Sequence, residues 1–166
     1  MGKLFGTDGI RGVVGENLTV DLAFRVGQAV GTVLLEEKGA RPTVVLGKDT
    51  RISSDLLEAA LIAGLCSVGA DVKPVGDIPT PAVAYLTRQE KADAGIVVSA
   101  SHNPYEHNGI KVFNGQGYKL SDALEERVEE KILSKEPMVL KTREELGRRH
   151  HGMKQLKRDY IDFVAS

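Results

Sequence analysis

The run Ala94-Gly95-Ile96-Val97-Val98-Ser99 constrains the fold more than any other segment. It is short, continuously apolar and rich in β-branched residues, which is typical of a strand buried on both faces of a sheet. A second short apolar run, Thr43 to Gly47, follows Pro42. Both runs stand between segments whose apolar residues recur at helical spacing. Because a strand buried on both faces needs helices above and below it, the pattern predicts an α/β protein.

The chain alternates strand and helix patterns along its length. We expect strands over 43–47, 72–75, 94–99 and 110–113, the last at a sheet edge, and helices over 20–37, 54–68, 80–88, 122–133 and 153–164. Segment 134–149 is charged and poorly patterned, so we expect a mobile excursion with a short helix at most. This order predicts a three-layer α/β/α sandwich with a mixed, mostly parallel sheet of about four strands.

In such sheets, ligands bind outside the carboxyl ends of the strands. Two polar loops leave strands at that edge, Lys48 to Arg51 and Ser99 to Asn108. The candidate chemistry should therefore lie where these two loops meet.

Charge and cysteine content limit the partners and the compartment. The 166 residues include 22 Lys and Arg and 23 Asp and Glu, a formal net charge of -1. This balance gives no global basis for binding nucleic acid or an acidic membrane, and we expect neither partner. A single cysteine, Cys66, fits a reducing compartment. With no apolar leader at the first residues and no run of membrane-spanning length, we expect a cytoplasmic protein.

The densest polar segment is Ser99-Ala100-Ser101-His102-Asn103-Pro104, which continues through Asn108-Gly109-Ile110-Lys111. A serine alcohol is a poor nucleophile unless a base, a cation or a metal assists it. His102 follows Ser101 directly, and neighbouring side chains usually diverge, so a simple Ser-His dyad is disfavoured. Lys111 and Arg11 are cations that would offset the charge of a phosphate. A polar turn with hydroxyl caps is the alternative that spacing alone leaves open.

Two further blocks are candidates for anion binding. The opening block Gly6-Thr7-Asp8-Gly9-Ile10-Arg11-Gly12 combines close backbone approach with a fixed positive charge, although it lacks the Gly-Lys-Ser/Thr ending of a P-loop. The block Lys48-Asp49-Thr50-Arg51 leads into a helix N-terminus, where Lys48 and Arg51 would support a phosphate. A structural glycine turn and an ordinary surface ion pair are the respective alternatives.

These blocks, together with Pro79-Thr80-Pro81-Ala82 and in this order, resemble the α-D-phosphohexomutase family. The resemblance runs from about Lys3 to the C-terminus and is strongest to the bacterial phosphoglucosamine mutase branch. It implies that Ser101 is phosphorylated and passes its phosphoryl group to a sugar phosphate substrate. A hexosamine 1,6-bisphosphate is the implied intermediate, which reorients and returns its other phosphate to the serine.

The resemblance also implies roles for individual residues. Lys111 is associated with acid/base work and charge stabilisation, and Arg11 with holding the phosphoserine region. His102 and Asn103 match family positions around the same centre. One position departs from the family pattern, because the loop usually reads Arg-x-Ser-Gly and Ser54 stands in place of the glycine. We expect Ser54 to cap the helix that follows.

Family enzymes have four domains, and residues 1–166 match the first of them. The implied cofactor is Mg²⁺, bound by the phosphate on Ser101 and by an Asp-x-Asp-x-Asp-Arg loop in the second domain. This sequence contains no Asp-x-Asp cluster, so we expect domain I only, with domains II to IV absent and little activity of its own. The resemblance further allows a homodimer through this domain.

The resemblance therefore implies the phosphoserine domain of an enzyme of the phosphoglucosamine mutase branch, which interconverts glucosamine 6-phosphate and glucosamine 1-phosphate for UDP-N-acetylglucosamine and cell-wall precursors. A phosphoglucomutase or phosphomannomutase domain is the alternative within the family. A serine hydrolase would need a Gly-x-Ser-x-Gly elbow, and Ala100-Ser101-His102 is not one. A non-catalytic interaction module is the remaining alternative.

Overall fold

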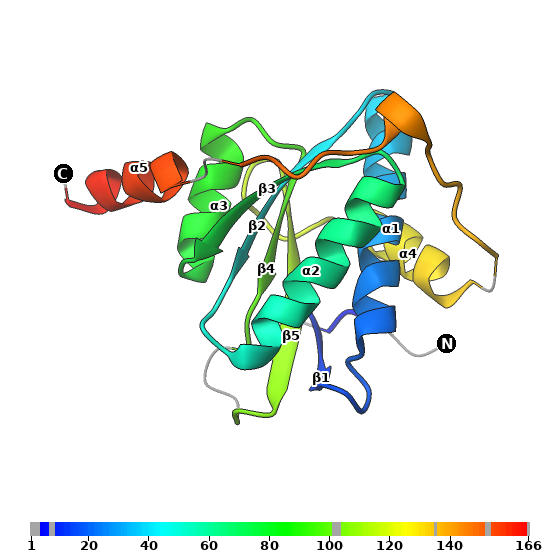
Figure 1. The fold of residues 1–166 in the computed structure, drawn as a ribbon, viewed down its shortest axis with the longest axis horizontal. Coiled ribbons are helices and arrows are strands. Elements are labelled where there is room, and N and C mark those ends of the chain that lie inside the picture. The colour runs from blue at the N-terminus through cyan, green and yellow to red at the C-terminus, as the bar shows by residue number, and fades with distance from the viewer. Residues whose placement is uncertain (1–3, 7–8, 101–103, 135, 152–153, 166) are drawn as a thin grey trace.

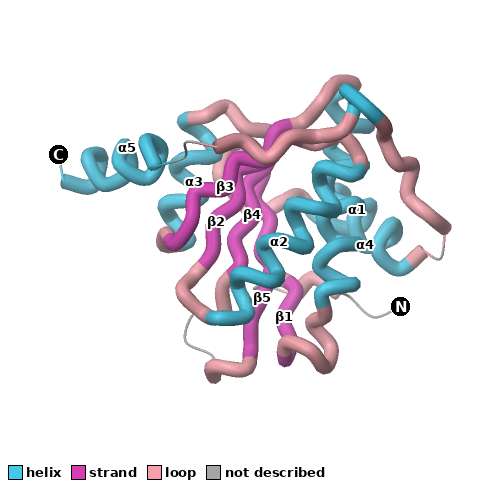
Figure 2. The backbone as a smooth tube through the Cα atoms, viewed as in Figure 1, coloured by secondary structure: helices cyan, strands magenta, loops and turns pink. Residues whose placement is uncertain are grey.

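A five-stranded sheet lies between two layers of helices in the computed structural model (Figures 1 and 2). The structure describes residues 4–6, 9–100, 104–134, 136–151 and 154–165. One face of the sheet carries α1 (Val20–Lys38), α2 (Ile52–Ser67) and α4 (Asp122–Leu133), and the other carries α3 (Thr80–Gln89). The predicted three-layer architecture is confirmed.

The strands follow the order β1-β5-β4-β2-β3 across the sheet. They are β1 (Ile10–Val13), β2 (Thr43–Lys48), β3 (Asp71–Asp77), β4 (Ala94–Val98) and β5 (His107–Asn114). Strand β2 is parallel to β3 and β4, whereas β5 is antiparallel to β4 and β1. The sheet is therefore mixed, as predicted.

Strand β1 was missed by the sequence analysis, and the expectation that β5 forms an edge was wrong. β1 pairs with β5 from Ile10 opposite Ile110 to Val13 opposite His107, and so places β5 inside the sheet. The pattern was hidden because β1 has four residues and turns only Ile10 and Gly12 toward one face. A single apolar side chain and a glycine give no readable alternation.

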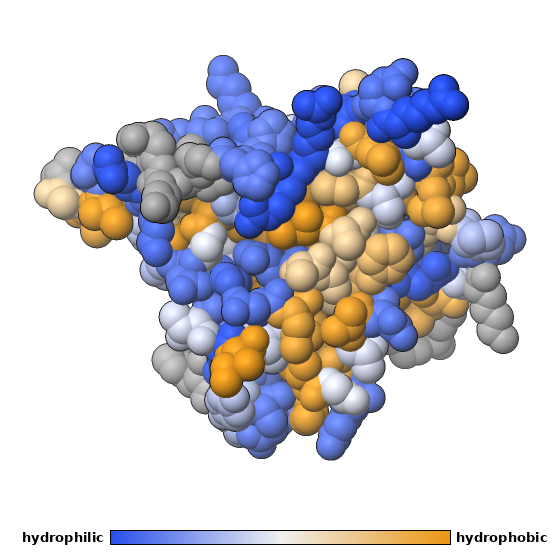
Figure 3. Space-filling view, viewed as in Figure 1, coloured by the Kyte–Doolittle hydropathy of each residue, from blue (hydrophilic) through white to orange (hydrophobic). Residues whose placement is uncertain are grey.

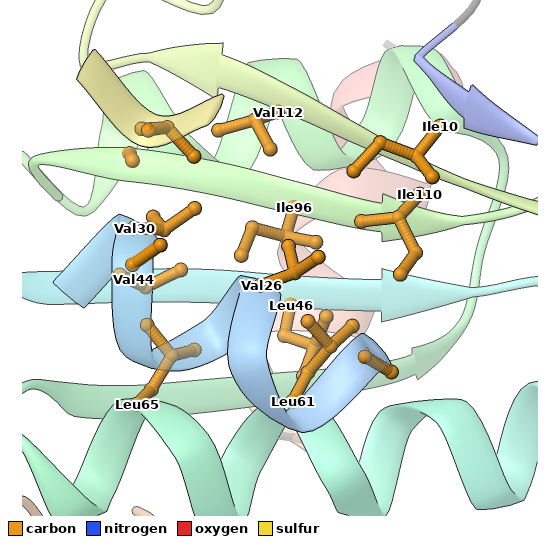
Figure 4. Close-up of a cluster of buried hydrophobic side chains, with 14 of the residues drawn as sticks. Ile10, Val26, Val30, Val44, Leu46, Leu61, Leu65, Ile96, Ile110 and Val112 are labelled. Atoms are coloured by element: carbon orange, nitrogen blue, oxygen red, sulfur yellow. The ribbon is translucent and has the colours of Figure 1, made fainter. Parts of the chain in front are cut away.

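Alternate residues of the central strands supply two separate cores. Leu46 and Ile96 pack with residues of α1 and α2 such as Val26 and Leu61 (Figure 4). Their neighbours Val45 and Val97 face α3 instead. All five residues of β4 are buried, so the continuous apolar run marks a strand with no solvent-facing side, as its sequence predicted.

The first two helices pack at backbone contact. A Cβ on Gly27 would lie 2.6 Å from the carbonyl oxygen of Leu61, and one on Gly64 would lie 2.2 Å from that of Phe24. Neither position has room for a side chain. The two helices therefore form one rigid layer beneath β2 and β4.

Segment 136–150 runs from α4 back to the edge strand β3, and it is not a free excursion. Its backbone N–H groups donate to helix α2 and β3, with Gly147 N to Cys66 O at 2.9 Å and His150 N to Val72 O at 2.8 Å. The expected short helix is a single 3₁₀ turn, η1 (Arg143–Glu145). Tertiary hydrogen bonds, which a polar sequence does not reveal, fix the rest.

Helix α5 (Lys154–Ala165) follows and lies beyond α3 at one end of the molecule (Figure 1). Tyr85 of α3 stacks on Phe163 of α5 with ring centroids 4.3 Å apart. Among the helices that the structure describes, none combines the length and the apolar character needed to cross a membrane.

Candidate active site

The two polar loops predicted to meet at the sheet edge do meet there. Strands β2 and β4 are parallel neighbours, so the loops after Lys48 and Val98 leave the sheet side by side. The N–H of Asp49 donates to the carbonyl oxygen of Val98 at 2.9 Å. The guanidinium of Arg51 donates from Nη1 to Pro104 O at 2.7 Å and to His107 O at 3.0 Å. The β2–α2 loop thus holds the far end of the loop after β4.

Ser101, His102 and Asn103 lie outside the described residues, but the positions on both sides of them are described. Ala100 is fully buried, and Ser99 N donates to Gly109 O at 3.0 Å. On the far side, His107 N donates to Pro104 O at 3.0 Å and closes a turn. The segment that contains Ser101 is therefore bracketed by fixed backbone. Its proposed chemistry stays a prediction.

Arg11 reaches this segment from strand β1. It lies opposite Gly109 on β5, and its Nη2 approaches the carbonyl oxygen of Ala100 at a long 3.5 Å. Its Nε is buried and has no hydrogen-bond partner among the described residues. A buried guanidinium donor without a partner has donor capacity left for an anion. This geometry suits the predicted role of Arg11 beside a phosphate.

Lys111 lies one strand further in, opposite Val97 of β4. It is half-buried, and in the described part of the chain no carboxylate forms an ion pair with it. A cavity of about 190 Å³ opens beside it, lined by Phe5, Gly9, Thr80, Lys111, Val112, Phe113, Lys119 and Glu125. Lys111 and Arg11 both occupy positions on the α3 side of the sheet, at the carboxyl end of β4.

Lys48, which was predicted to support a phosphate, contacts carboxylates instead. Its ammonium forms a hydrogen bond with Asp55 and lies 3.8 Å from Glu58 and 3.9 Å from Asp77. The hydrogen bond with Asp55 and the nearby acids raise the pKa of Lys48 despite its burial. Burial raises the pKa of Glu58. These contacts match the alternative stated for the Lys48 block, an ordinary ion pair. Direct contact between Lys48 and a phosphate stays a prediction, and the geometry does not support it.

Asp49 was not among the predicted site residues, yet it organises the edge. Its carboxylate accepts hydrogen bonds from Arg51 Nε at 3.1 Å, from Arg51 N at 3.1 Å and from the hydroxyl of Ser54 at 2.5 Å. Burial would raise the pKa of Asp49, but the hydrogen bonds from Ser54 and Arg51 and the charge of Arg51 lower it. The carboxylate is thus held ionised beside Arg51.

Ser54 does not cap helix α2, so that expectation was wrong. The helix begins at Ile52 with no side-chain cap, and Ser54 is fully buried in its first turn. Its hydroxyl bonds Asp49 and accepts from Nδ2 of Asn108 at 3.0 Å. Asn108 is itself fully buried on β5. The sequence carries one sign of these hydrogen bonds, namely a serine at position 54, where the family pattern Arg-x-Ser-Gly has glycine.

The predicted Mg²⁺ site needs a cluster of side chains that can bind a metal ion. In the part of the chain that the structure describes, no group of three or more His, Cys, Asp or Glu side chains is arranged to hold a metal ion. Those residues therefore do not fit a complete magnesium site of their own.

A family model described as phosphoglucomutase/phosphomannomutase, alpha/beta/alpha domain I, matches residues 2–138. The chain belongs to this family. Phosphohexomutase sequences similar to it include phosphoglucosamine mutases from Acetivibrio thermocellus and Caldanaerobacter subterraneus, each 58% identical, and from Clostridium botulinum, 55% identical. Each of these matches covers 100% of the chain and 37% of the relative. The chain thus spans little more than a third of the length of these relatives.

Solved structures share the phosphohexomutase fold. A phosphoglucomutase/phosphomannomutase family protein from Burkholderia thailandensis superposes with a TM-score of 0.71 at 28% identity, over 89% of this chain and 32% of that one. The phosphoglucomutase parafusin from Paramecium superposes with a TM-score of 0.62 at 20% identity, over 79% of this chain and 25% of that one. The second likeness supports the fold alone.

Proposed function

We propose that this chain is the phosphoserine-bearing first domain of a phosphoglucosamine mutase, which interconverts glucosamine 6-phosphate and glucosamine 1-phosphate. The observation that carries this proposal is the identity of 58% across the whole chain to proteins of that name. The bracketed segment around Ser101 at the carboxyl edge of the sheet supports it. Domains II to IV would then lie in the remainder of a longer, cytoplasmic protein.

The proposed step is a transfer of the phosphoryl group between Ser101 and the sugar. The bond between phosphorus and the serine oxygen breaks, a bond to a sugar hydroxyl oxygen forms, and the hydroxyl proton leaves to a base. The hexosamine 1,6-bisphosphate that results then returns its other phosphate to Ser101. Such reactions depend chiefly on in-line positioning and on cations around the transferred group.

Two cations of this chain are placed for that work. Arg11, whose Nε has no partner among the described residues, would hold the phosphate on Ser101. Lys111, half-buried beside the cavity, would stabilise charge and move the sugar proton. His102 and Asn103 would complete the surroundings of the serine. Arg51 would act on the phosphate indirectly, through the loop it holds.

The proposed cofactor is Mg²⁺, which would shield the charge of the phosphate on Ser101. The described residues offer no ligand cluster for it. In this proposal its remaining ligands would come from the second domain of the longer protein.

A homodimer through this domain is a further part of the proposal. Four large apolar side chains are exposed on the outer side of α1 and α2, namely Val20 (49%), Phe24 (36%), Ile52 (72%) and Leu56 (39%). Figure 3 shows a continuous apolar band over α2. An exposed apolar patch of this kind is typical of an interface. Sedimentation at micromolar concentration tests it, and Ile52→Glu should shift a dimer to monomer.

The decisive experiment is the mass of the intact full-length protein after incubation with a hexose 1,6-bisphosphate. One added phosphate that Ser101→Ala abolishes is the expected result. Turnover of glucosamine, glucose and mannose phosphates by the same preparation then separates the proposal from the phosphoglucomutase and phosphomannomutase alternative, which the name of the Burkholderia structure keeps open. A protein that gains no phosphate at Ser101 would contradict the proposal.

A further inference from the structure

A closed path of hydrogen bonds joins the β2–α2 loop to strand β5. Asn108 Nδ2 donates to the hydroxyl oxygen of Ser54 at 3.0 Å, and the Ser54 hydroxyl donates to Asp49 Oδ1 at 2.5 Å. The other oxygen of Asp49 accepts from Arg51 Nε at 3.1 Å. Arg51 Nη1 then donates to His107 O at 3.0 Å, next to Asn108. We call Asp49, Arg51, Ser54 and Asn108 the serine-loop clamp.

Half of the clamp is fully buried, and its members are hydrogen-bonded to one another. Ser54 and Asn108 are fully buried, and the side chains of Arg51 and Asp49 are 14% and 25% exposed. Asn108 Oδ1 accepts from Gly109 N at 2.8 Å, so both ends of this amide are used. Such a network favours a single arrangement, because loss of one member would leave the buried Ser54 or Asn108 without a hydrogen-bond partner.

The clamp ends on the backbone that carries Ser101. Arg51 also donates to Pro104 O at 2.7 Å, three residues after Ser101. On the near side, Arg11 approaches Ala100 O, one residue before Ser101. Among the residues that the structure describes, a carboxylate anchors Arg51 but not Arg11, since Asp49 forms an ion pair with Arg51. The position of the far end of the serine segment therefore depends on Asp49.

We infer that Asp49 is a positioning residue for phosphoryl transfer, which acts through Arg51 to hold Ser101 in line with the sugar. This inference rests on the proposed function of Ser101. Asp49 has no direct contact with the sugar in this role. Its loss should slow the transfer step without weakening sugar binding, because a displacement of about 1 Å at the reacting atoms is enough to cost on the order of 100-fold in rate.

The test uses Asp49→Asn, Ser54→Ala and the double variant in the full-length protein. For Asp49→Asn we expect kcat to fall on the order of 10- to 100-fold while KM for the sugar phosphate stays within about twofold. The losses in the double variant should be smaller than the product of the single losses, because both changes break one path. Amide hydrogen exchange of residues 99–109 should become faster in each variant.

Asp71→Asn is the matched control. Asp71 also pairs with an arginine, Arg41 at 3.0 Å, and accepts from a backbone N–H, that of Arg148 at 2.9 Å, but at the opposite end of the sheet. It should lower stability and leave both kcat and exchange at 99–109 unchanged. Thermal unfolding shows that each variant is folded at the assay temperature.

An Asp49→Asn protein with unchanged kcat, or with a raised KM and normal kcat, overturns the inference. Unchanged exchange at residues 99–109 overturns it as well, and this readout does not need an active enzyme. If the unsubstituted protein takes no phosphate on Ser101, the proposed function has failed, while the exchange data still decide whether Asp49 holds the loop.

Discussion

Arg11 lies directly opposite Gly109 across the β1–β5 pair, and its side chain occupies the space that a side chain on residue 109 would need. A Cβ on Gly109 would be 3.1 Å from Arg11 Cγ and 3.0 Å from the carbonyl oxygen of Ser99. The glycine thus lets the guanidinium cross β5 toward the segment that carries Ser101. The absence of a side chain at Gly109 on β5 therefore determines where the Arg11 side chain of β1 can lie.

Gly109→Ala should therefore displace Arg11 and slow phosphoryl transfer on the order of 10-fold in the full-length protein. The added methyl group should also destabilise the domain by about 1–3 kcal/mol, because it is inserted into a packed site. Single-turnover transfer from phosphorylated Ser101 and urea unfolding measure the two effects. Gly39→Ala is the control: it has open space but a φ of 69°, so it should cost stability without changing transfer.

Gly64→Ala should be destabilising, although alanine is ordinarily the better helix former by about 1 kcal/mol. Its Cβ would lie 2.2 Å from the carbonyl oxygen of Phe24, so α1 and α2 would have to separate. We expect a loss of about 1–3 kcal/mol in the free energy of unfolding. Ala59 lies on the exposed side of the same helix, so Ala59→Gly measures the difference in helix propensity between alanine and glycine without any change in packing. A stabilised Gly64→Ala protein would show that the two helices are not in backbone contact.

Much of the fold followed from local patterns in the sequence. The run at Ala94–Val98 identified a strand buried on both faces, and the helical spacing over 20–37 and 122–133 matches α1 (Val20–Lys38) and α4 (Asp122–Leu133). Such signals are contained in one stretch of consecutive residues. The short β1 strand and the anchored segment 136–150 depend instead on partners far along the chain, so no local pattern marks them.

The candidate site was predictable to the same extent. Parallel strands bring their carboxyl ends to one edge, and this rule correctly placed the Lys48 and Ser99 loops together. It did not distinguish cations that are free from cations that are paired. Lys48 binds three carboxylates, whereas Arg11 keeps an unpartnered Nε among the described residues. That difference depends on the three-dimensional positions of Asp55, Glu58 and Asp77.

The acid stability of the domain should depend on Asp71. Burial would raise the pKa of this carboxyl, but hydrogen bonds from Arg148 N, His150 and Arg41 outweigh it and lower the pKa below its ordinary value. A carboxyl whose pKa is lower when folded contributes stability that is present above its unfolded pKa of about 3.9 and lost as the pH falls through the folded value.

We therefore expect Asp71→Asn to reduce the urea midpoint at pH 7, and the gap to the unsubstituted protein to narrow steadily below about pH 4. Glu126→Gln is the control, since the side chain of Glu126 is exposed in the middle of α4. Unfolding curves between pH 7 and pH 3 measure the gap. A difference in urea midpoint that stays constant over this range would contradict the prediction. It would mean that the charge of Asp71 does not hold segment 136–150, because the N–H of Arg148 and the guanidinium of Arg41 would then bind a neutral side chain equally well.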